Sequence, residues 1–219
     1  MYGTPLALLG NLWLCWDALC HAQGVFFVER RAVEDRKLKA IIMDGEAMRR
    51  AVTRIAHEIL EHNSGAQNLG IVGIVSRGVP IARILSQEIQ DIEGVRPPVG
   101  QLDISFYRDD VRRSIAPVLH ATSIPFDIDK HDIVLVDDVL YTGRTVRSAL
   151  DALMDLGRPK TVQLAVMVDR GHRELPIRAD YVGKNVPSSH NESVRVHIKE
   201  TDGDNSVTIW EKLNEGGER

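Results

Sequence analysis

The sequence predicts an α/β fold with a mostly parallel central sheet flanked by helices. Two short apolar runs, residues 70–75 and 133–136, have the composition of strands that are buried on both faces of a sheet. Segments with helical periodicity alternate with such runs, in the order strand, helix, strand, strand, helix, strand. This order is typical of parallel strands whose crossover helices cover the two faces of the sheet.

Each expected helix has signals at its ends. The first should begin after Asp44, a favourable N-cap, and end at residues 63–65, because apolar residues recur between these limits at helical spacing. The second should follow the turn at residues 76–78 and reach about residue 90. The third is expected at residues 145–156 and is closed by a glycine.

Further strands are expected at residues 99–107, 161–168, 194–198 and 207–210. The polar, irregular stretch at residues 108–123 has the length of a mobile functional loop, and a dense polar segment covers residues 169–184. Ligands of parallel sheets bind beyond the carboxyl ends of the strands. The turn at 76–78, the segment 137–145 and the segment from 169 onward should therefore surround one crevice.

Composition sets limits on the function. The 219 residues are 43% hydrophobic and 26% charged, which is ordinary for a soluble globular protein, and no repeats occur. A net charge of −4 gives no overall basic balance, so any contact with nucleic acid needs a local basic face. The two cysteines, Cys15 and Cys20, form neither a metal-ligand set nor a disulfide framework, which fits a reducing cytoplasm.

Three regions are expected along the chain: an extension at residues 1–39, a domain at 40–212 and a polar tail at 213–219. The apolar stretch at residues 6–20 suggests a signal peptide or membrane anchor. However, no Lys or Arg precedes it, Asn11 and Asp17 interrupt it, and it is shorter than the roughly 20 residues that span a bilayer. We expect a start assigned too far upstream, with the true start near Val33 or Leu38, and no membrane association.

The segment from Asp137 to Thr145 carries the clearest chemistry. Adjacent carboxylates, Asp137 and Asp138, at a strand end can hold the 2′ and 3′ hydroxyls of a ribose or a hydrated Mg²⁺. In the turn that follows, Gly143 lets backbone N–H groups approach an anion, and the start of a helix favours negative charge. The pattern predicts a ribose-5-phosphate site. The alternative is an ordinary strand end with a threonine N-cap.

Residues 133–145 resemble the signature for 5-phosphoribosyl-1-pyrophosphate (PRPP) in type I phosphoribosyltransferases. Residues 40–210 resemble more closely the PyrR family within that group, which attenuates pyrimidine operons and has uracil phosphoribosyltransferase activity. The matching segments are residues 49–58, 107–110, 137–145 and, most specifically, 168–180. The resemblance implies a type I phosphoribosyltransferase fold with a small hood.

The resemblance also implies the reaction of uracil with PRPP to give UMP and diphosphate, with Mg²⁺ as cofactor. The metal would be held mainly through PRPP, with Asp137 and Asp138 as candidate ligands. The implied catalytic residues are Asp137, Asp138, Arg77 and Arg108. The implied PRPP- and UMP-binding residues are Ser76, Arg77, Gly78, Ile133, Val134, Leu135, Val136, Asp137, Asp138, Val139, Leu140, Tyr141, Thr142, Gly143, Arg144, Thr145, Val168, Asp169 and Arg170.

Two details of this assignment depart from the family pattern or stay open. Ser76 stands where the family more often has threonine, and it keeps the hydroxyl group. The loop that begins at Tyr107 would close over PRPP and exclude water. It is shorter here, so Arg112 and Arg113 are either phosphate contacts or a solvated basic pair.

The sequence has two basic segments, one on the first helix and one within residues 170–184. On periodicity alone, both are interpreted as solvated surface. The resemblance implies that they bind a stem-loop in the pyrimidine-operon mRNA leader, favoured by UMP or UTP and presented by a homodimer or higher oligomer. The implied RNA-binding residues are Thr53, Arg54, His57, Arg173, Arg178 and Lys184. The alternatives are a salvage enzyme without RNA binding and a PRPP-site regulator without catalysis.

Overall fold

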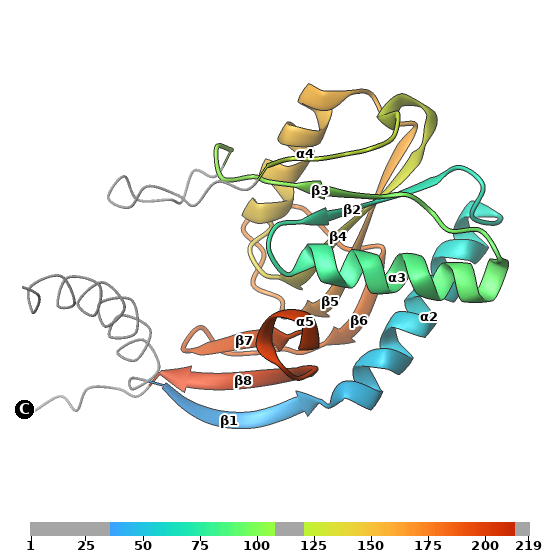
Figure 1. The fold of residues 1–219 in the computed structure, drawn as a ribbon. Coiled ribbons are helices and arrows are strands. Elements are labelled where there is room, and N and C mark those ends of the chain that lie inside the picture. Colours follow the sequence, from blue (N-terminus) through green and yellow to red (C-terminus); the bar gives the residue numbers. More distant parts are fainter. Residues whose placement is uncertain (1–35, 108–120, 213–219) are drawn as a thin grey trace, which may run out of the picture. The chain divides into compact units, whose positions relative to one another are not determined.

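A five-stranded parallel sheet in the order β3–β2–β4–β5–β6 carries the fold (Figure 1). The computed structural model describes residues 36–107 and 121–212, most of which belong to one unit, Leu38–Trp210. The strands of this sheet are β2 (Leu69–Ile74), β3 (Val99–Leu102), β4 (Asp132–Leu140), β5 (Thr161–Asp169) and β6 (Tyr181–Asn185). All four pairings are parallel, so the predicted sheet is confirmed.

Helices cover both faces of the sheet. Helices α2 (Gly45–Asn63) and α3 (Gly78–Glu93) lie on one face, and α4 (Arg144–Leu156) lies on the other (Figure 1). Alternate side chains of a strand point to opposite faces. Accordingly, Val134 and Val136 of β4 join the core under α2 and α3, whereas Ile133 and Leu135 join the core under α4. Burial on both faces explains why residues 133–136 of β4 are an unbroken apolar run.

The helix ends follow the local sequence signals. The Asp44 side chain accepts a hydrogen bond from the Ala47 amide at 2.7 Å and caps α2, which ends at Ser64 in the left-handed conformation. Helix α3 continues to Glu93, beyond the expected end near residue 90, and Gly94 closes it with a φ of 76°. Gly157 closes α4, as predicted.

A second, smaller sheet forms the hood, in the order β1–β8–β7. Its strands are β1 (Arg36–Met43), β7 (Glu192–His197) and β8 (Ser206–Lys212), and the short helix α5 (Lys199–Asp202) connects the last two. A 3₁₀ turn, η1 (Ile128–Lys130), precedes β4. Side chains such as Val196 and Val207 belong to the same buried core as α2 and α3, so the hood packs on that side.

Some of the expected strand limits were wrong. The strand expected at residues 99–107 ends at Leu102, because the Asp103 carboxylate accepts a hydrogen bond from the Ser105 amide at 2.8 Å and turns the chain. Ser123, expected in an irregular loop, pairs with Gln101 in an antiparallel bridge. Strands β1 and β6 were not predicted. The rest of the predicted loop, residues 108–120, lies outside the described residues.

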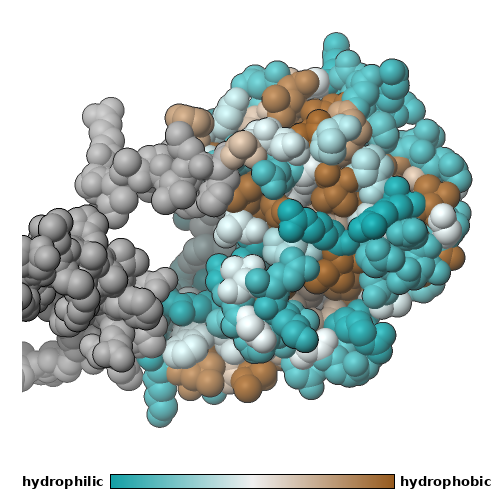
Figure 2. All heavy atoms as spheres, in the orientation of Figure 1, coloured by the Kyte–Doolittle hydropathy of each residue, from teal (hydrophilic) through white to brown (hydrophobic). Residues whose placement is uncertain are grey.

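On the face shown in Figure 2, hydrophobic residues form separate patches between hydrophilic ones. Across residues 36–107 and 121–212, no helix combines the length and the apolar character needed to cross a bilayer. The apolar N-terminal stretch considered above lies outside the described residues.

Candidate functional site

The sheet order brings three chemically distinctive segments to one edge. Strand β4 lies between β2 and β5, and all three run in the same direction. Their carboxyl ends therefore place the turn at residues 76–78, the acid pair of β4 and the segment beginning at Asp169 side by side. This is the grouping that the sequence predicted.

The acid pair lies within β4, not beyond its end. Asp137 is 6% exposed, and one of its oxygens accepts a hydrogen bond from the Asp138 amide at 2.9 Å. Asp138 in turn accepts from the Val139 amide at 2.8 Å. Burial raises the pKa of Asp138, although the amide of Val139 and the positive charge of Arg77 oppose that effect. The site is therefore electrostatically prepared for a cation or for hydroxyl donors.

The turn between β4 and α4 leaves the amino end of a helix open. Gly143 is the N-cap of α4, with a φ of 93° that favours glycine, so the N-cap residue has no side chain to offer the helix amides. The Thr142 hydroxyl accepts from the first of these amides, that of Arg144, at 3.3 Å. The N-cap residue is therefore glycine and not the threonine of the alternative interpretation. Helix amides that lack a cap can bind an anion, and the dipole of α4 favours negative charge at this end.

The turn is fastened to the segment that follows β5. The amides of Glu174 and Leu175 donate to the Thr142 carbonyl at 3.0 and 3.2 Å. The Arg144 guanidinium donates to the Glu174 carboxylate at 2.7 Å. These contacts hold the open helix end in one place relative to β5. They join residues that are thirty or more positions apart in the sequence.

The turn after β2 brings a basic side chain to the same edge. Ser76 is exposed there, while Gly78 is buried, and a Cβ at residue 78 would lie 2.4 Å from the Val136 carbonyl oxygen. Only glycine allows this close approach of α3 to β4. The Arg77 guanidinium pairs with Asp202 of α5 at 2.9 Å. A cavity of about 310 Å³ opens beside this turn, between α3 and α5, and is partly lined by Ser76.

Arg173 is the centre of a hydrogen-bond network behind the crevice. It donates to the carbonyls of Tyr141 and Ile177, both at 2.8 Å, and to that of Gly171 at 3.1 Å. It also forms an ion pair with Asp169. The network ties the turn after β4 to the turn after β5. This predicted RNA-binding residue therefore has a structural task within the chain.

Arg170 is also committed to the protein. Its buried guanidinium donates to the carbonyl oxygens of Ser189 and Glu192 and to the Ser188 hydroxyl, and it lies 4.1 Å from the centre of the Tyr141 ring. Next to it, the rings of His172 and His190 lie 4.1 Å apart. Arg170 therefore shapes the wall of the crevice and orients Tyr141.

Several predicted binding residues support the site without lining it through their side chains. They are core residues of β4 and β5, namely Ile133, Val134, Leu135, Val136, Leu140 and Val168. Val139 is partly buried and packs against the core, and Thr145 lies in the first turn of α4. Arg108 lies outside the described residues. Tyr107, just before it, donates to Asp155 at 2.6 Å, and this hydrogen bond raises the pKa of its phenol.

The predicted RNA-binding residues fall into two groups. Within the described ranges, the side chains of His57 and Arg178 are exposed and make no hydrogen bond or ion pair. Arg54 pairs with Glu58 at 2.6 Å and also donates to the carbonyls of Val182 and Gly183 on β6. The other three are likewise bonded within the chain: Thr53 donates to Glu88, Lys184 donates to the Ile42 carbonyl, and Arg173 makes the contacts described above.

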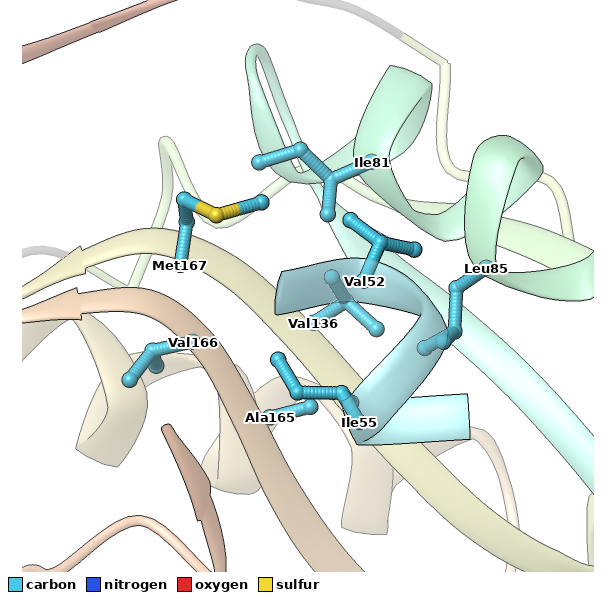
Figure 3. Close-up of a pocket in the computed structure, with 8 residues that line it drawn as sticks. All are labelled: Val52, Ile55, Ile81, Leu85, Val136, Ala165, Val166 and Met167. Carbon is cyan, nitrogen blue, oxygen red and sulfur yellow. The ribbon is translucent and has the colours of Figure 1, made fainter. Parts of the chain in front are cut away.

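A separate apolar pocket in the core does not suit a nucleotide. Figure 3 shows it between α2, α3 and the sheet, lined only by Val52, Ile55, Ile81, Leu85, Val136, Ala165, Val166 and Met167. The volume of this pocket is about 10 Å³, and none of the side chains that line it is polar. It is a packing void, and the polar crevice at the strand ends remains the candidate site.

Whether Mg²⁺ fits this site can be judged from the ligands that Asp137 and Asp138 offer. Carboxylate oxygens suit Mg²⁺, which prefers six oxygen ligands. Among the described residues, however, no group of three or more His, Cys, Asp or Glu side chains comes together. A magnesium ion at Asp137 and Asp138 would thus need most of its ligands from a bound phosphate compound and water.

One important residue at the site could not be found from the sequence. Asp202 reaches Arg77 from 125 positions away, and nothing in the local sequence marks it. It follows β7 in a short polar segment that resembles many surface turns. Only the position of α5 in the hood brings it to the crevice.

Comparison with known proteins agrees with this geometry. The phosphoribosyl transferase domain matches residues 40–201. The "Bifunctional protein PyrR" of Deinococcus deserti is 57% identical over 174 residues, which are 79% of this chain and 95% of the relative. The protein of the same name from Acetivibrio thermocellus is 61% identical over 172 residues, 78% of this chain and 94% of the relative.

Solved structures show the same fold at lower identity. The hypoxanthine phosphoribosyltransferase of Trypanosoma cruzi is 18% identical, with a TM-score of 0.61 over 80% of this chain and 98% of its own. A hypoxanthine-guanine phosphoribosyltransferase of Bacillus anthracis is 16% identical, with a TM-score of 0.60 over 78% and 98%. The chain belongs to the phosphoribosyltransferase family and, within it, to the PyrR family.

Proposed function

We propose that this protein transfers the phosphoribosyl group of PRPP to uracil, with UMP and diphosphate as products. We further propose that it regulates pyrimidine biosynthetic operons by binding their mRNA leaders in response to UMP or UTP, through transcriptional attenuation. The observation that carries the first role is the acid pair of β4, of which Asp137 is buried, beside the amino end of α4 with its glycine N-cap. Membership of the PyrR family supports both roles.

In this proposal each part of the crevice binds one part of PRPP. The open amides of α4 hold the 5′ phosphate, and Asp137 and Asp138 accept hydrogen bonds from the ribose hydroxyls. Arg77 binds the diphosphate. N1 of uracil forms a bond to C1 of the ribose while the bond from C1 to the diphosphate oxygen breaks, and the N1 proton passes to solvent. Catalysis then depends on positioning and on stabilising the leaving charge.

Mg²⁺ is the proposed cofactor. Asp137 and Asp138 supply suitable oxygen ligands, and PRPP oxygens and water would complete the six. When bound, the ion neutralises charge on the departing diphosphate. Arg108 and the loop after Tyr107 are proposed to close over PRPP and exclude water, which protects it from hydrolysis.

For RNA, the proposed surface joins the exposed face of α2 to the segment after β5. His57 and Arg178 are available for phosphate or base contacts. Arg54, Arg173 and Lys184 would contribute donors that the protein contacts leave open, and Thr53 would contribute its hydroxyl oxygen as an acceptor, because its one O–H already donates within the chain. We propose a homodimer or higher oligomer in the cytoplasm. The domain would span residues 40–212, between an extension at 1–39 and a polar tail at 213–219.

The enzymatic role is tested by incubating the protein with PRPP, Mg²⁺ and labelled uracil. UMP should form, and orotate or hypoxanthine in place of uracil should react far more slowly. Asp138→Asn should lower the rate, because it removes a charge from the ribose or metal contact. A preference for hypoxanthine over uracil would refute the substrate assignment.

The regulatory role is tested by gel-shift titration of the host's pyrimidine-operon leader RNA. UMP should tighten binding, and added salt should weaken it, because RNA binding releases counterions. Arg178→Ala should cost about 1–3 kcal/mol of RNA affinity and leave UMP formation unchanged. A salvage enzyme without RNA binding is the second candidate, favoured by the internal contacts of Arg54 and Arg173. It would show no difference between leader RNA and an unrelated RNA.

A further inference from the structure

The pairing of Arg77 with Asp202 joins the hood to the crevice. One oxygen of the Asp202 carboxylate accepts from Nη2 of Arg77 at 2.9 Å, and the other lies 3.4 Å from Nε. Both contacts use the same edge of the guanidinium, so the carboxylate grips it side-on. The Asp202 side chain is only 16% exposed, and the guanidinium is partly shielded. This is therefore not an ordinary solvated surface pair.

Asp202 is itself firmly held. Its carboxylate accepts from the Ile198 amide at 3.0 Å, and its own amide donates to the Ile198 carbonyl at 2.7 Å. Partial burial disfavours the charged form, but the Ile198 amide and the nearby charges of Arg77 and His197 lower the pKa of Asp202. The carboxylate therefore remains ionised at neutral pH. A rigid anion on α5 can fix the direction of a flexible arginine side chain.

The grip leaves the opposite edge of Arg77 available. A guanidinium has five N–H donors, and the side-on contact uses two of them. Within the described residues, Nη1 makes no hydrogen bond. The turn that carries Arg77 lies against the acid pair, because a Cβ at the next residue, Gly78, would lie 3.4 Å from the Cα of Asp137. The positive charge of Arg77 also lowers the pKa of Asp138. The free edge is thus the one that can meet an anion in the crevice.

We infer that Asp202 is a positioning residue for phosphoribosyl transfer, which holds Arg77 side-on so that its remaining edge binds the diphosphate of PRPP. The inference rests on the proposed function. It adds the hood to the substrate-binding machinery and makes a specific distinction between two ligands. PRPP has a diphosphate on C1, whereas UMP has none. Loss of Asp202 should therefore affect PRPP and spare UMP.

The test is calorimetric titration of Asp202→Asn, a variant of the same size that loses the negative charge. With Mg²⁺ and without uracil, its dissociation constant for PRPP should rise about tenfold, as expected when a charge-assisted hydrogen bond no longer orients the ligand's partner. Its dissociation constant for UMP should stay unchanged. Glu200→Gln is the matched control: Glu200 is also on α5 but lies 3.9 Å from Arg83, so both affinities should be retained.

A double-mutant cycle shows whether Asp202 acts through Arg77. In the background of Arg77→Gln, adding Asp202→Asn should weaken PRPP binding no further, because the group it positions is already absent. Tighter PRPP binding by Asp202→Asn would mean that the carboxylate competes with diphosphate, and it would overturn the inference. Equal weakening of PRPP and UMP would do the same, because it would indicate a general disturbance of the fold.

The outcomes separate this inference from the proposed function. If the unmodified protein neither binds PRPP nor forms UMP, the proposed function fails. If it does both and Asp202→Asn binds PRPP equally well, only the role of Asp202 fails. Circular dichroism of each variant identifies any that has lost its fold. If Asp202→Asn has lost its fold, Asp202→Glu is measured in its place. It should keep part of the PRPP affinity, because it keeps the negative charge at this position.

Discussion

Replacing Arg173 by alanine should lower the stability of the protein as well as weaken its proposed binding of RNA. Four hydrogen-bonded contacts would be lost together, three to carbonyl oxygens and one to the Asp169 carboxylate. The two side chains of the ion pair are 23% and 16% exposed. Among the residues that the structure describes, the Asp169 carboxylate would then accept only from the Gly171 amide, at 2.9 Å. Breaking a well-buried pair costs about 3–5 kcal/mol, and partial exposure reduces this to roughly 2–4 kcal/mol.

The measurement is urea unfolding followed by circular dichroism. The midpoint should fall while the slope stays constant, which indicates a change in stability alone. Arg173→Lys should lose less, about 1–2 kcal/mol, because the ammonium keeps the ion pair but cannot reach all three carbonyls. Arg178→Ala, at an exposed arginine of the same segment, should stay within about 0.5 kcal/mol. If Arg173→Ala lost RNA affinity at unchanged stability, the structural role of Arg173 would be refuted.

Three further predictions concern other parts of the domain. Burial raises the pKa of Asp138 above its unfolded value, so the stability of the unliganded protein should increase as pH falls through that raised pKa. In thermal scans, Asp138→Asn should abolish this increase. The variant should also be more stable than wild type at neutral pH, because it has no buried charge at this position. Gln163→Leu should cost about 1–3 kcal/mol in urea unfolding, because Gln163 accepts from buried Tyr181 at 2.7 Å and exchanges hydrogen bonds with Asn63. Gly143→Ala should cost about 1 kcal/mol at its φ of 93° and weaken PRPP binding measured by calorimetry.

Each of these has a clear contrary result. The Asp138 prediction fails if wild type and variant show the same pH dependence of melting temperature. For Gln163, the exposed Gln87→Leu is the control, and equal stability of the two variants would refute the role of the buried network. For Gly143, unchanged PRPP affinity together with unchanged stability would show that the turn adapts without strain.

The general fold could be predicted from the sequence because its signals are local. Strands β2, β4 and β5 are buried on both faces along their central parts, so each contains an apolar run, at residues 69–74, 133–136 and 164–168, which can be recognised without knowledge of its neighbours. The N-cap of α2 involves residues three positions apart. Strand β6 was missed for the opposite reason: five residues with an internal glycine form a strand only because β5 pairs with them.

The residues of the candidate site also fall into those that a local sequence pattern reveals and those whose role depends on distant segments. Asp137, Asp138 and the turn to Gly143 are consecutive along the chain, so their chemistry was visible in the sequence alone. Gly143 could also be anticipated, since an anion cradle needs a residue without a side chain. Which arginines face a ligand was not visible, because that depends on acceptors supplied by other segments.

The sequence by itself determined the parallel sheet, the helix ends and the acid pair beside an open helix end, since each arises from neighbouring residues. Only the tertiary structure decided the roles of the arginines. Arg173 reaches Tyr141 across 32 positions, and Arg77 reaches Asp202 across 125. A guanidinium bonds to whichever acceptor the fold brings near. Its task is therefore set by packing between distant segments, which no local pattern records.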